Sequence, residues 1–294
     1  MVQYNPKDWF TFIFRFHKAD TFRKLFPMMI AIGAYSYIIG YLEMEYWQLS
    51  QNDQLKNITV MHSTLGFVIS LLLAYRTNTA YDRWWEGRKI WGQLTNASRN
   101  FALKLDTILE NEHDKKYFKT ILPTFAHELA IYLRKDETGK MLWEDQDETE
   151  KQLRSEIDRK KHIPLQIAKL MHIKIQRLYH EQKITAEQLL FIKDELTAFT
   201  DIIGASERIK NTPIPYSYSA FIKKFIFVYI MTLPFGYVFN LGYYVIPVVV
   251  FIFYVLASLE LIAEEIEDPF GDDANDLPID NIARNIKKHI SEIL

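Results

Sequence analysis

Two short stretches come close to catalytic motifs, and each lacks a residue that its chemistry requires. Gly87 and Gly92 have the five-residue spacing that opens a phosphate-binding loop, but Gln93 stands where the phosphate-binding lysine belongs. Residues 127–128, His-Glu, begin like the helical zinc-protease motif, but Ile131 stands where the second imidazole belongs. The chain also has no cysteine and no Gly-x-Ser-x-Gly elbow. We therefore expect no enzymatic activity.

A stretch after residue 263 concentrates carboxylates, which are the ligands that a hard cation such as Ca²⁺ prefers. The candidate residues are Glu264, Glu265, Glu267, Asp268, Asp272 and Asp273. The EF-hand pattern fails here, because no glycine stands at the sixth position of a loop begun at Asp272 or Asp273. Two roles stay open, ion pairing with Arg76, Arg83 and Arg88 or a calcium site. We expect the ion pairs, and no required cofactor.

The charges of the chain nearly balance, since 35 Lys and Arg side chains stand against 37 Asp and Glu side chains. There is no basic surplus to attract phosphates, so we expect no nucleic-acid partner. Hydrophobic residues make up 49% of the 294 residues, and glycine and proline number only 10 each, which favours long helices. The apolar residues are gathered in a few stretches, as is typical of a membrane protein.

Four apolar stretches predict membrane-spanning helices, because a hydrocarbon core about 30 Å thick needs about 20 predominantly apolar residues. They cover residues 25–42, 58–75, 225–239 and 241–259. Only the region of Asn240 separates the last two, which predicts a tight helical hairpin. The alternative is a soluble protein with buried core helices, but four such runs are too many for one soluble core.

Basic residues indicate how these spans are oriented. Arg23 and Lys24 precede the first span and Arg76 and Arg83 follow the second, whereas the loop between them is acidic. Because Lys and Arg accumulate on the cytoplasmic side, we expect both termini in the cytoplasm and the chain in the inner (plasma) membrane. Residues 1–24 mix aromatic and basic side chains, so we expect an interfacial amphipathic segment on the lipid bilayer.

The second span carries two neighbouring stripes at four-residue spacing. The stripe of small side chains, where a neighbouring helix can approach closely, consists of Gly66, Ser70 and Ala74. The bulky stripe consists of Phe67, Leu71 and Tyr75. If several copies of this helix surround an axis, the bulky side chains form apolar rings that gate by excluding water. The alternative is that they face lipid or the rest of the bundle.

The block between the second and third spans, residues 76–218, is charged on nearly every turn and contains no flexible linker. Apolar spacing at three, four or seven residues predicts helices over residues 84–108, 117–133, 165–179 and 185–208. The first of these continues the second span as one long helix. Thr185 and Gln188 have the spacing of a capping box that opens the last.

Several motifs extend along nearly the whole chain. They are LAYRTN (73–78), YDRWWE (81–86), GASER (204–208), TPIP (212–215) and EEIEDPFG (264–271). In these motifs the chain resembles the bestrophin family, in particular its bacterial members. The resemblance implies a homopentameric ion channel in which the second span of each copy lines a narrow neck above a wide cytosolic vestibule. Eukaryotic relatives are mainly calcium-activated anion channels, so calcium binding is implied as possible here.

The resemblance also assigns the neck. The family uses three hydrophobic residues at four-residue spacing, the last of them aromatic, and this pattern maps onto Phe67, Leu71 and Tyr75. The family resemblance thus favours the pore over a lipid-facing role for these residues. Tyrosine departs mildly from the pattern, because its hydroxyl can hydrogen-bond to an ion or to water.

A second constriction, the cytosolic aperture, is usually ringed in the family by a small or branched apolar side chain. Counting from the GASER motif places Glu187 there, with Ile184 and Leu189 as alternatives. A ring of Glu187 carboxylates would favour cations over anions. The plainer role is that Glu187 follows the cap residue Thr185, where any acid is stabilised by the helix N-terminus.

We therefore expect an all-α integral membrane protein with four transmembrane helices and a helical cytosolic domain, assembled as a homopentamer around a central pore. The expected segments are an interfacial segment (1–24), spans one and two (25–75), the cytosolic helical domain (76–218), spans three and four (219–262) and an acidic cytosolic C-terminal segment (263–294). The expected function is passive conduction of small monovalent ions, mainly chloride, so the partners are permeant ions, lipid and other copies. The alternatives are a cation-selective channel with a Glu187 ring and a non-conducting membrane scaffold or sensor.

Overall fold

The computed structural model describes residues 21–47, 58–134, 153 and 155–294. Every regular element in these residues is a helix, as expected, and the chain divides into two compact units. Unit 1 contains Met1–Arg83, Pro213–Glu267 and Asp273–Asn275, and unit 2 contains Trp84–Thr212, Asp268–Asp272 and Asp276–Leu294. Most of the interfacial segment expected at 1–24 lies outside the described residues.

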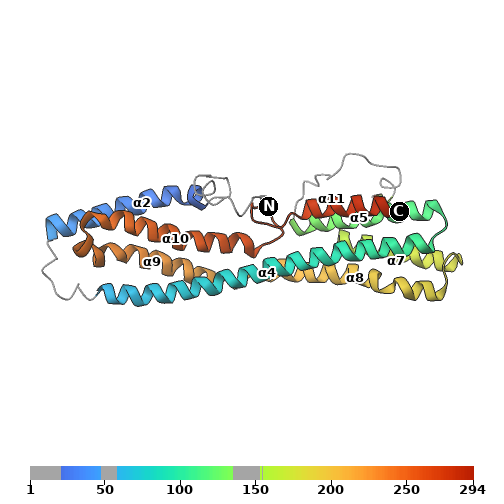
Figure 1. Cartoon of the computed structure of the whole chain (residues 1–294), viewed down its shortest axis with the longest axis horizontal. Coiled ribbons are helices and arrows are strands. Elements are labelled where there is room, and N and C mark those ends of the chain that lie inside the picture. The colour runs from blue at the N-terminus through green and yellow to red at the C-terminus, as the bar shows by residue number, and fades with distance from the viewer. Residues whose placement is uncertain (1–20, 48–57, 135–152, 154) are drawn as a thin grey trace. The chain divides into compact units, whose positions relative to one another are not determined.

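Unit 1 contains α2 (Thr21–Tyr41), α9 (Tyr216–Leu241), α10 (Val245–Glu267) and the first half of α4 (Ile58–Ile108) (Figure 1). Helix α10 packs against both α2 and α9. Helix α2 continues as a π-helical segment, Leu42–Trp47, and a 3-10 turn, Gly242–Tyr244, joins α9 to α10. Gly242 begins this turn at a φ of 54°, a left-handed conformation that glycine adopts without strain. The predicted helical hairpin is confirmed.

Three helical stretches of the described chain are long and apolar enough to cross a membrane, namely Thr21–Trp47, Ile58–Ile108 and Ala186–Glu267. The third contains both α9 and α10, which we expected to cross separately, so the number of four crossings stays a prediction. Only 17% of the most apolar window of Ile58–Ile108 is buried within the chain. This helix therefore keeps apolar surface for contact with lipid or with another copy.

Unit 2 combines the rest of α4 with α5 (Glu112–Arg134), α7 (Ile163–His180), α8 (Ala186–Asn211) and α11 (Ile279–Ile293) (Figure 1). The four helices predicted between residues 84 and 208 are confirmed, and α4 is one continuous helix. The capping box is confirmed too: Gln188 N donates to Thr185 Oγ1 at 3.2 Å, and Thr185 N donates to Gln188 Oε1 at 2.8 Å. Helix α11 was not predicted, although its isoleucines recur at helical spacing.

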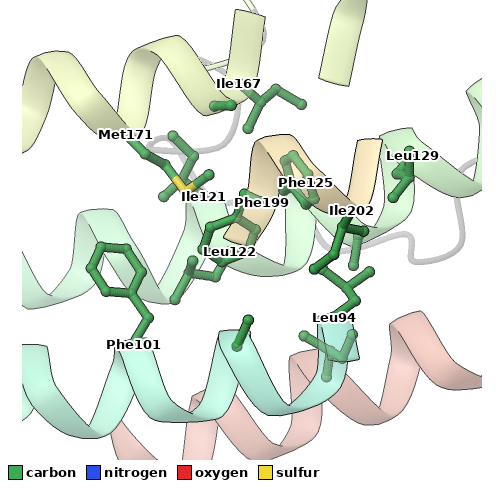
Figure 2. Packing of buried hydrophobic residues seen from close by; sticks show 14 of the residues in the cluster. Leu94, Phe101, Ile121, Leu122, Phe125, Leu129, Ile167, Met171, Phe199 and Ile202 are labelled. Atoms are coloured by element: carbon green, nitrogen blue, oxygen red, sulfur yellow. The ribbon is translucent and has the colours of Figure 1, made fainter. Parts of the chain in front are cut away.

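Side chains of α4, α5, α7, α8 and α11 form the core of unit 2, and Figure 2 labels residues of the first four helices. The labelled residues are Leu94 and Phe101 of α4, Ile121, Leu122, Phe125 and Leu129 of α5, Ile167 and Met171 of α7, and Phe199 and Ile202 of α8. The ring centroid of Phe199 lies 4.9 Å from that of Phe125 and 6.0 Å from that of Phe101, both edge to face. Such pairs contribute about 0.5–1.5 kcal/mol each beyond the burial of their area. Phe199 therefore joins α8 to both α4 and α5.

Candidate pore-lining face and the charged cluster beside it

The three bulky residues predicted to form a neck lie on one exposed face of α4. Phe67 is 70% exposed, Leu71 47% and Tyr75 61%. The intervening Ile69 and Leu73 are only 1% exposed each and belong to the core of unit 1. Residues four apart share a helix face, so this burial pattern turns the bulky stripe away from the chain's own core.

The stripe of small residues lies beside this face. Gly66 contacts Tyr229 of α9 so closely that a Cβ at Gly66 would lie 2.7 Å from the tyrosine hydroxyl. Ser70 donates to the backbone oxygen of Gly66 at 2.8 Å, and both Ser70 and Ala74 are exposed. Of these three small residues, Gly66 makes a close helix contact with the described part of the chain, whereas Ser70 and Ala74 are exposed.

A buried arginine directly follows Tyr75, the last of the residues predicted to form the neck. Arg76 is 1% exposed, with Nη2 2.7 Å from Glu267 Oε2 and Nε 3.6 Å from Glu260 Oε2. We call these three residues the Arg76 cluster. Ile214 N donates to Glu267 Oε1 at 2.6 Å, and Arg83 Nε donates to the backbone oxygen of Glu267 at 3.1 Å. Glu267 thereby links α4, α10 and the segment before α9.

Glu260 was missed in the sequence because it stands one residue beyond the fourth apolar stretch as we bounded it. A carboxylate between Leu259 and Leu261, in an otherwise apolar helix, was the signal that could have identified it.

Other acids in the last turn of α10 and just after it also have basic or amide partners. Glu264 pairs with Lys223 at 2.9 Å, and Glu265 pairs with Lys24 at 2.6 Å and accepts from Asn275 at 2.7 Å. In unit 2, Asp272 pairs with Arg134 at 3.1 Å.

The predicted ion pairing is therefore found for Arg76, whereas Arg88 forms no ion pair with another described residue. Asp268 and Asp273 are exposed. No group of three or more His, Asp or Glu side chains that could hold a metal ion occurs among the described residues. Calcium binding stays a prediction.

The three aperture candidates differ in exposure. Glu187 lies in the first turn of α8 and is exposed. Ile184 is 3% exposed and belongs to the core of unit 2, and Leu189 packs against that core. Of the three, Glu187 is exposed, Leu189 is half-buried and Ile184 is buried.

Unit 2 also contains two polar clusters that we had not expected from the sequence. Asp114 is 2% exposed and pairs with Lys174 at 2.5 Å and with Lys183 at 3.1 Å. Burial opposes ionisation of Asp114, but the hydrogen bonds from the two lysines prevail and lower its pKa. Tyr132 donates to Glu207 at 2.6 Å, and burial together with this carboxylate raises the pKa of Tyr132 to about 12.

The chain matches known proteins along almost its whole length. A profile of the family described as Bacterial/Fungal Bestrophin protein matches residues 1–292. The chain belongs to this bestrophin family. A crystal structure of a bacterial bestrophin homologue from Klebsiella pneumoniae, carrying one substitution, aligns with 92% of this chain and 98% of its own, with a TM-score of 0.78 and 27% identity.

Curated bestrophin relatives are named for channel formation. A voltage-dependent anion channel-forming protein from a Nostoc species is 35% identical over 233 residues, which are 78% of this chain and 75% of that protein. The voltage-dependent anion channel-forming protein YneE of Salmonella typhi is 29% identical over 290 residues, which are 98% of this chain and 92% of that protein. The resemblance drawn from the sequence motifs is therefore confirmed at the level of the family.

The bestrophin-like motifs meet one another within each unit. In unit 1, Arg76 (73–78) and Glu267 (264–271) pair, and Ile214 (212–215) hydrogen-bonds to the same carboxylate. In unit 2, Arg208 (204–208) pairs with Glu86 (81–86). The Arg76–Glu267 and Arg208–Glu86 pairs each join segments that lie more than 100 residues apart in the sequence.

Proposed function

We propose that this bestrophin conducts ions passively, as a homopentamer in which α4 of each copy lines a central pore. The names of the curated relatives, voltage-dependent anion channel-forming proteins, support conduction. Phe67, Leu71 and Tyr75 of each copy would form the neck. An apolar ring excludes water, and an ion that has lost its hydration shell cannot pass at low cost, so the neck would act as the gate.

The observation that carries the proposal is the exposure of these three side chains on a helix whose opposite face is buried. A single chain that leaves Phe67 70% and Tyr75 61% exposed has unsatisfied apolar surface beside a tightly packed core. Contact between copies around an axis would use this surface. Contact with lipid is the competing role, and conduction measurements separate the two.

We propose small anions, chloride among them, as the permeant ions, because the relatives are named for anions. Glu187 is the group that opposes this assignment, since a ring of exposed carboxylates would repel anions. The Glu187→Gln variant should therefore leave the reversal potential near that of chloride if the anion assignment is right. A wild-type reversal potential near that of potassium, shifted towards chloride by Glu187→Gln, would instead establish the cation-selective alternative.

We further propose the inner membrane as the location, with both termini and residues 76–218 on the cytoplasmic side. The chain has no native cysteine, so a single Glu187→Cys substitution gives a unique label site. A membrane-impermeant maleimide should label this variant in inverted vesicles and not in right-side-out vesicles. The reverse pattern would overturn the orientation.

The neck is tested by single-channel recording from purified protein in planar bilayers under a KCl gradient. Leu71→Ala should widen the neck and raise conductance. Ile30→Ala is the matched control. Ile30 is 58% exposed on α2, and its replacement by alanine removes about as much of the side chain as Leu71→Ala does. Equal conductance of the two variants would refute the neck assignment, and silence of wild type and Leu71→Ala alike would favour a non-conducting scaffold.

A further inference from the structure

A groove of 530 Å³ opens among α2, α9 and α10 of unit 1. These helices lie side by side in Figure 1, with α10 packed against both of the others. The volume falls within the range of about 300–1,000 Å³ that small-ligand sites occupy. Its wall is mostly apolar and includes Met28, Phe227 and Met231, so the body of its occupant must be apolar.

The polar residues of the groove are gathered at one end. Lys223 near the start of α9 and Glu260 and Glu264 near the end of α10 line this end. At the other end Tyr35 also lines the groove, but its hydroxyl donates to the backbone oxygen of Met231 at 2.9 Å and is satisfied. From Lys223 to Met231 the helix rises about 12 Å, at about 1.5 Å per residue. The groove therefore suits an amphiphilic ligand, because one end is charged and the rest of its lining is apolar.

Glu260 supplies the observation that points to a ligand. It is 4% exposed, it lines the groove, and neither carboxylate oxygen accepts a hydrogen bond from the described residues. Its ion-pair partner Arg76 stands 3.6 Å away, which is beyond hydrogen-bonding distance. A buried carboxylate without a hydrogen-bond donor is costly, and a ligand that brings N–H groups would remove that cost.

The charges at the mouth specify the headgroup. The lining contains one ammonium, Lys223, and two carboxylates, so it attracts a cation while Lys223 can hold an anionic group. Lys223 and Glu264 pair with each other at 2.9 Å, and their side chains are 49% and 52% exposed. An exposed pair of this kind is weak, so a ligand that brings both charges can replace it. We infer that the groove binds a phospholipid whose headgroup carries a primary ammonium, as phosphatidylethanolamine does. The ammonium lies at Glu260 and Glu264, the phosphate lies at Lys223, and an acyl chain fills the apolar interior.

Headgroup chemistry makes this inference selective. Phosphatidylcholine has the same charges, but its methylated ammonium has no N–H to donate to Glu260. Phosphatidylglycerol has no ammonium and brings net negative charge towards two carboxylates. Hydrogen bonds to charged groups distinguish ligands by about tenfold or more. The phosphatidylethanolamine adduct should therefore bind about tenfold more tightly than the phosphatidylcholine adduct.

The test is native mass spectrometry of the purified full chain titrated with each of the three lipids. Glu260→Gln should abolish the preference for phosphatidylethanolamine over phosphatidylcholine. Glu260→Gln also changes the Arg76 cluster, so a second pair of variants tests the groove without changing any charged residue. Ala31 lines the groove and Ala34 is an exposed residue of the same helix that does not. Ala31→Phe should lose the bound lipid, whereas Ala34→Phe should retain it.

Equal binding of phosphatidylethanolamine and phosphatidylcholine by the wild type, tightest binding of phosphatidylglycerol, or retention of lipid by Ala31→Phe would each overturn the inference. A change of oligomeric state in Ala31→Phe with no lipid bound to wild type would overturn it as well, because a second copy would then occupy the groove. None of these readouts depends on ion conduction, so they test the lipid site independently of the channel proposal.

Discussion

Replacing Arg76 with glutamine tests whether the Arg76 cluster fixes α4 within unit 1. Arg76 is 1% exposed and lies 2.7 Å from Glu267, whose side chain is 15% exposed. At this separation, an effective dielectric constant of about 20 gives an attraction of about 6 kcal/mol, most of which offsets the dehydration of the two charges. The net contribution of the pair to the free energy of unfolding is therefore small, but removing only one of its two charges is strongly destabilising.

The expected loss follows from the carboxylates that Arg76→Gln leaves behind. Glu267 and Glu260, whose side chains are 15% and 5% exposed, would lose their common counter-charge. Breaking a buried pair by removing one partner costs about 3–5 kcal/mol. At about 2–4 °C per kcal/mol, the melting temperature should fall by about 10 °C. Circular dichroism of the protein in detergent during heating measures this change.

A double variant separates charge imbalance from lost packing. In Arg76→Gln with Glu267→Gln, one stranded charge is removed, and the amide oxygen can still accept from Ile214 N. We expect the double variant to melt higher than Arg76→Gln alone, with only partial recovery because Glu260 keeps its charge. A melting temperature of Arg76→Gln within about 2 °C of the wild type, or strictly additive losses in the double variant, would refute the reasoning.

Three further substitutions concern unit 2, each measured by thermal unfolding in detergent. Phe199→Ala should cost about 3–5 kcal/mol because it empties the centre of the core, and Phe199→Leu should cost less. Asp114→Asn should cost about 3 kcal/mol by leaving Lys174 without its carboxylate. Because the pKa of Asp114 is lowered in the folded state, its contribution to stability is complete above pH 3.8 and is lost as the pH falls through the lower folded pKa. Asp114→Asn should not show this loss of stability at acid pH. Thr185→Ala should cost about 1 kcal/mol by removing the cap of α8, and Thr185→Ser should cost almost nothing.

Features that lie within one helix could be predicted from the sequence. That Phe67, Leu71 and Tyr75 share one helix face follows from spacing alone, because residues four apart lie on the same face of any α-helix. The capping box at Thr185 depends on residues only three positions apart, and the long continuous α4 depends on an unbroken apolar period. Local geometry was sufficient in each of these cases.

Features that depend on contacts between distant segments were harder to predict. The acids at the end of α10 and just after it were expected to pair with arginines near the end of the second span. Glu265 instead pairs with Lys24, and Asp272 pairs with Arg134. Helix packing decides which basic side chain reaches which acidic one, and the order of charges in the sequence does not reveal that packing. The predicted aperture also depends on distant contacts, since such a ring would form only between copies. In the single chain Glu187 is exposed and Ile184 is buried.

The proposed neck and the Arg76 cluster are adjacent in the chain, and this adjacency links stability to the proposed gate. Consecutive residues of an α-helix point about 100° apart, so Tyr75 can face away from unit 1 while Arg76 is buried in it. The bond to Glu267 fixes the rotation of α4 about its axis at this point and thereby the direction of the Tyr75 side chain. Substitutions in the Arg76 cluster should therefore alter both melting temperature and conductance. Phe67 is exposed, so a substitution there removes little buried contact within the chain. Such a substitution should alter conductance and leave the melting temperature unchanged.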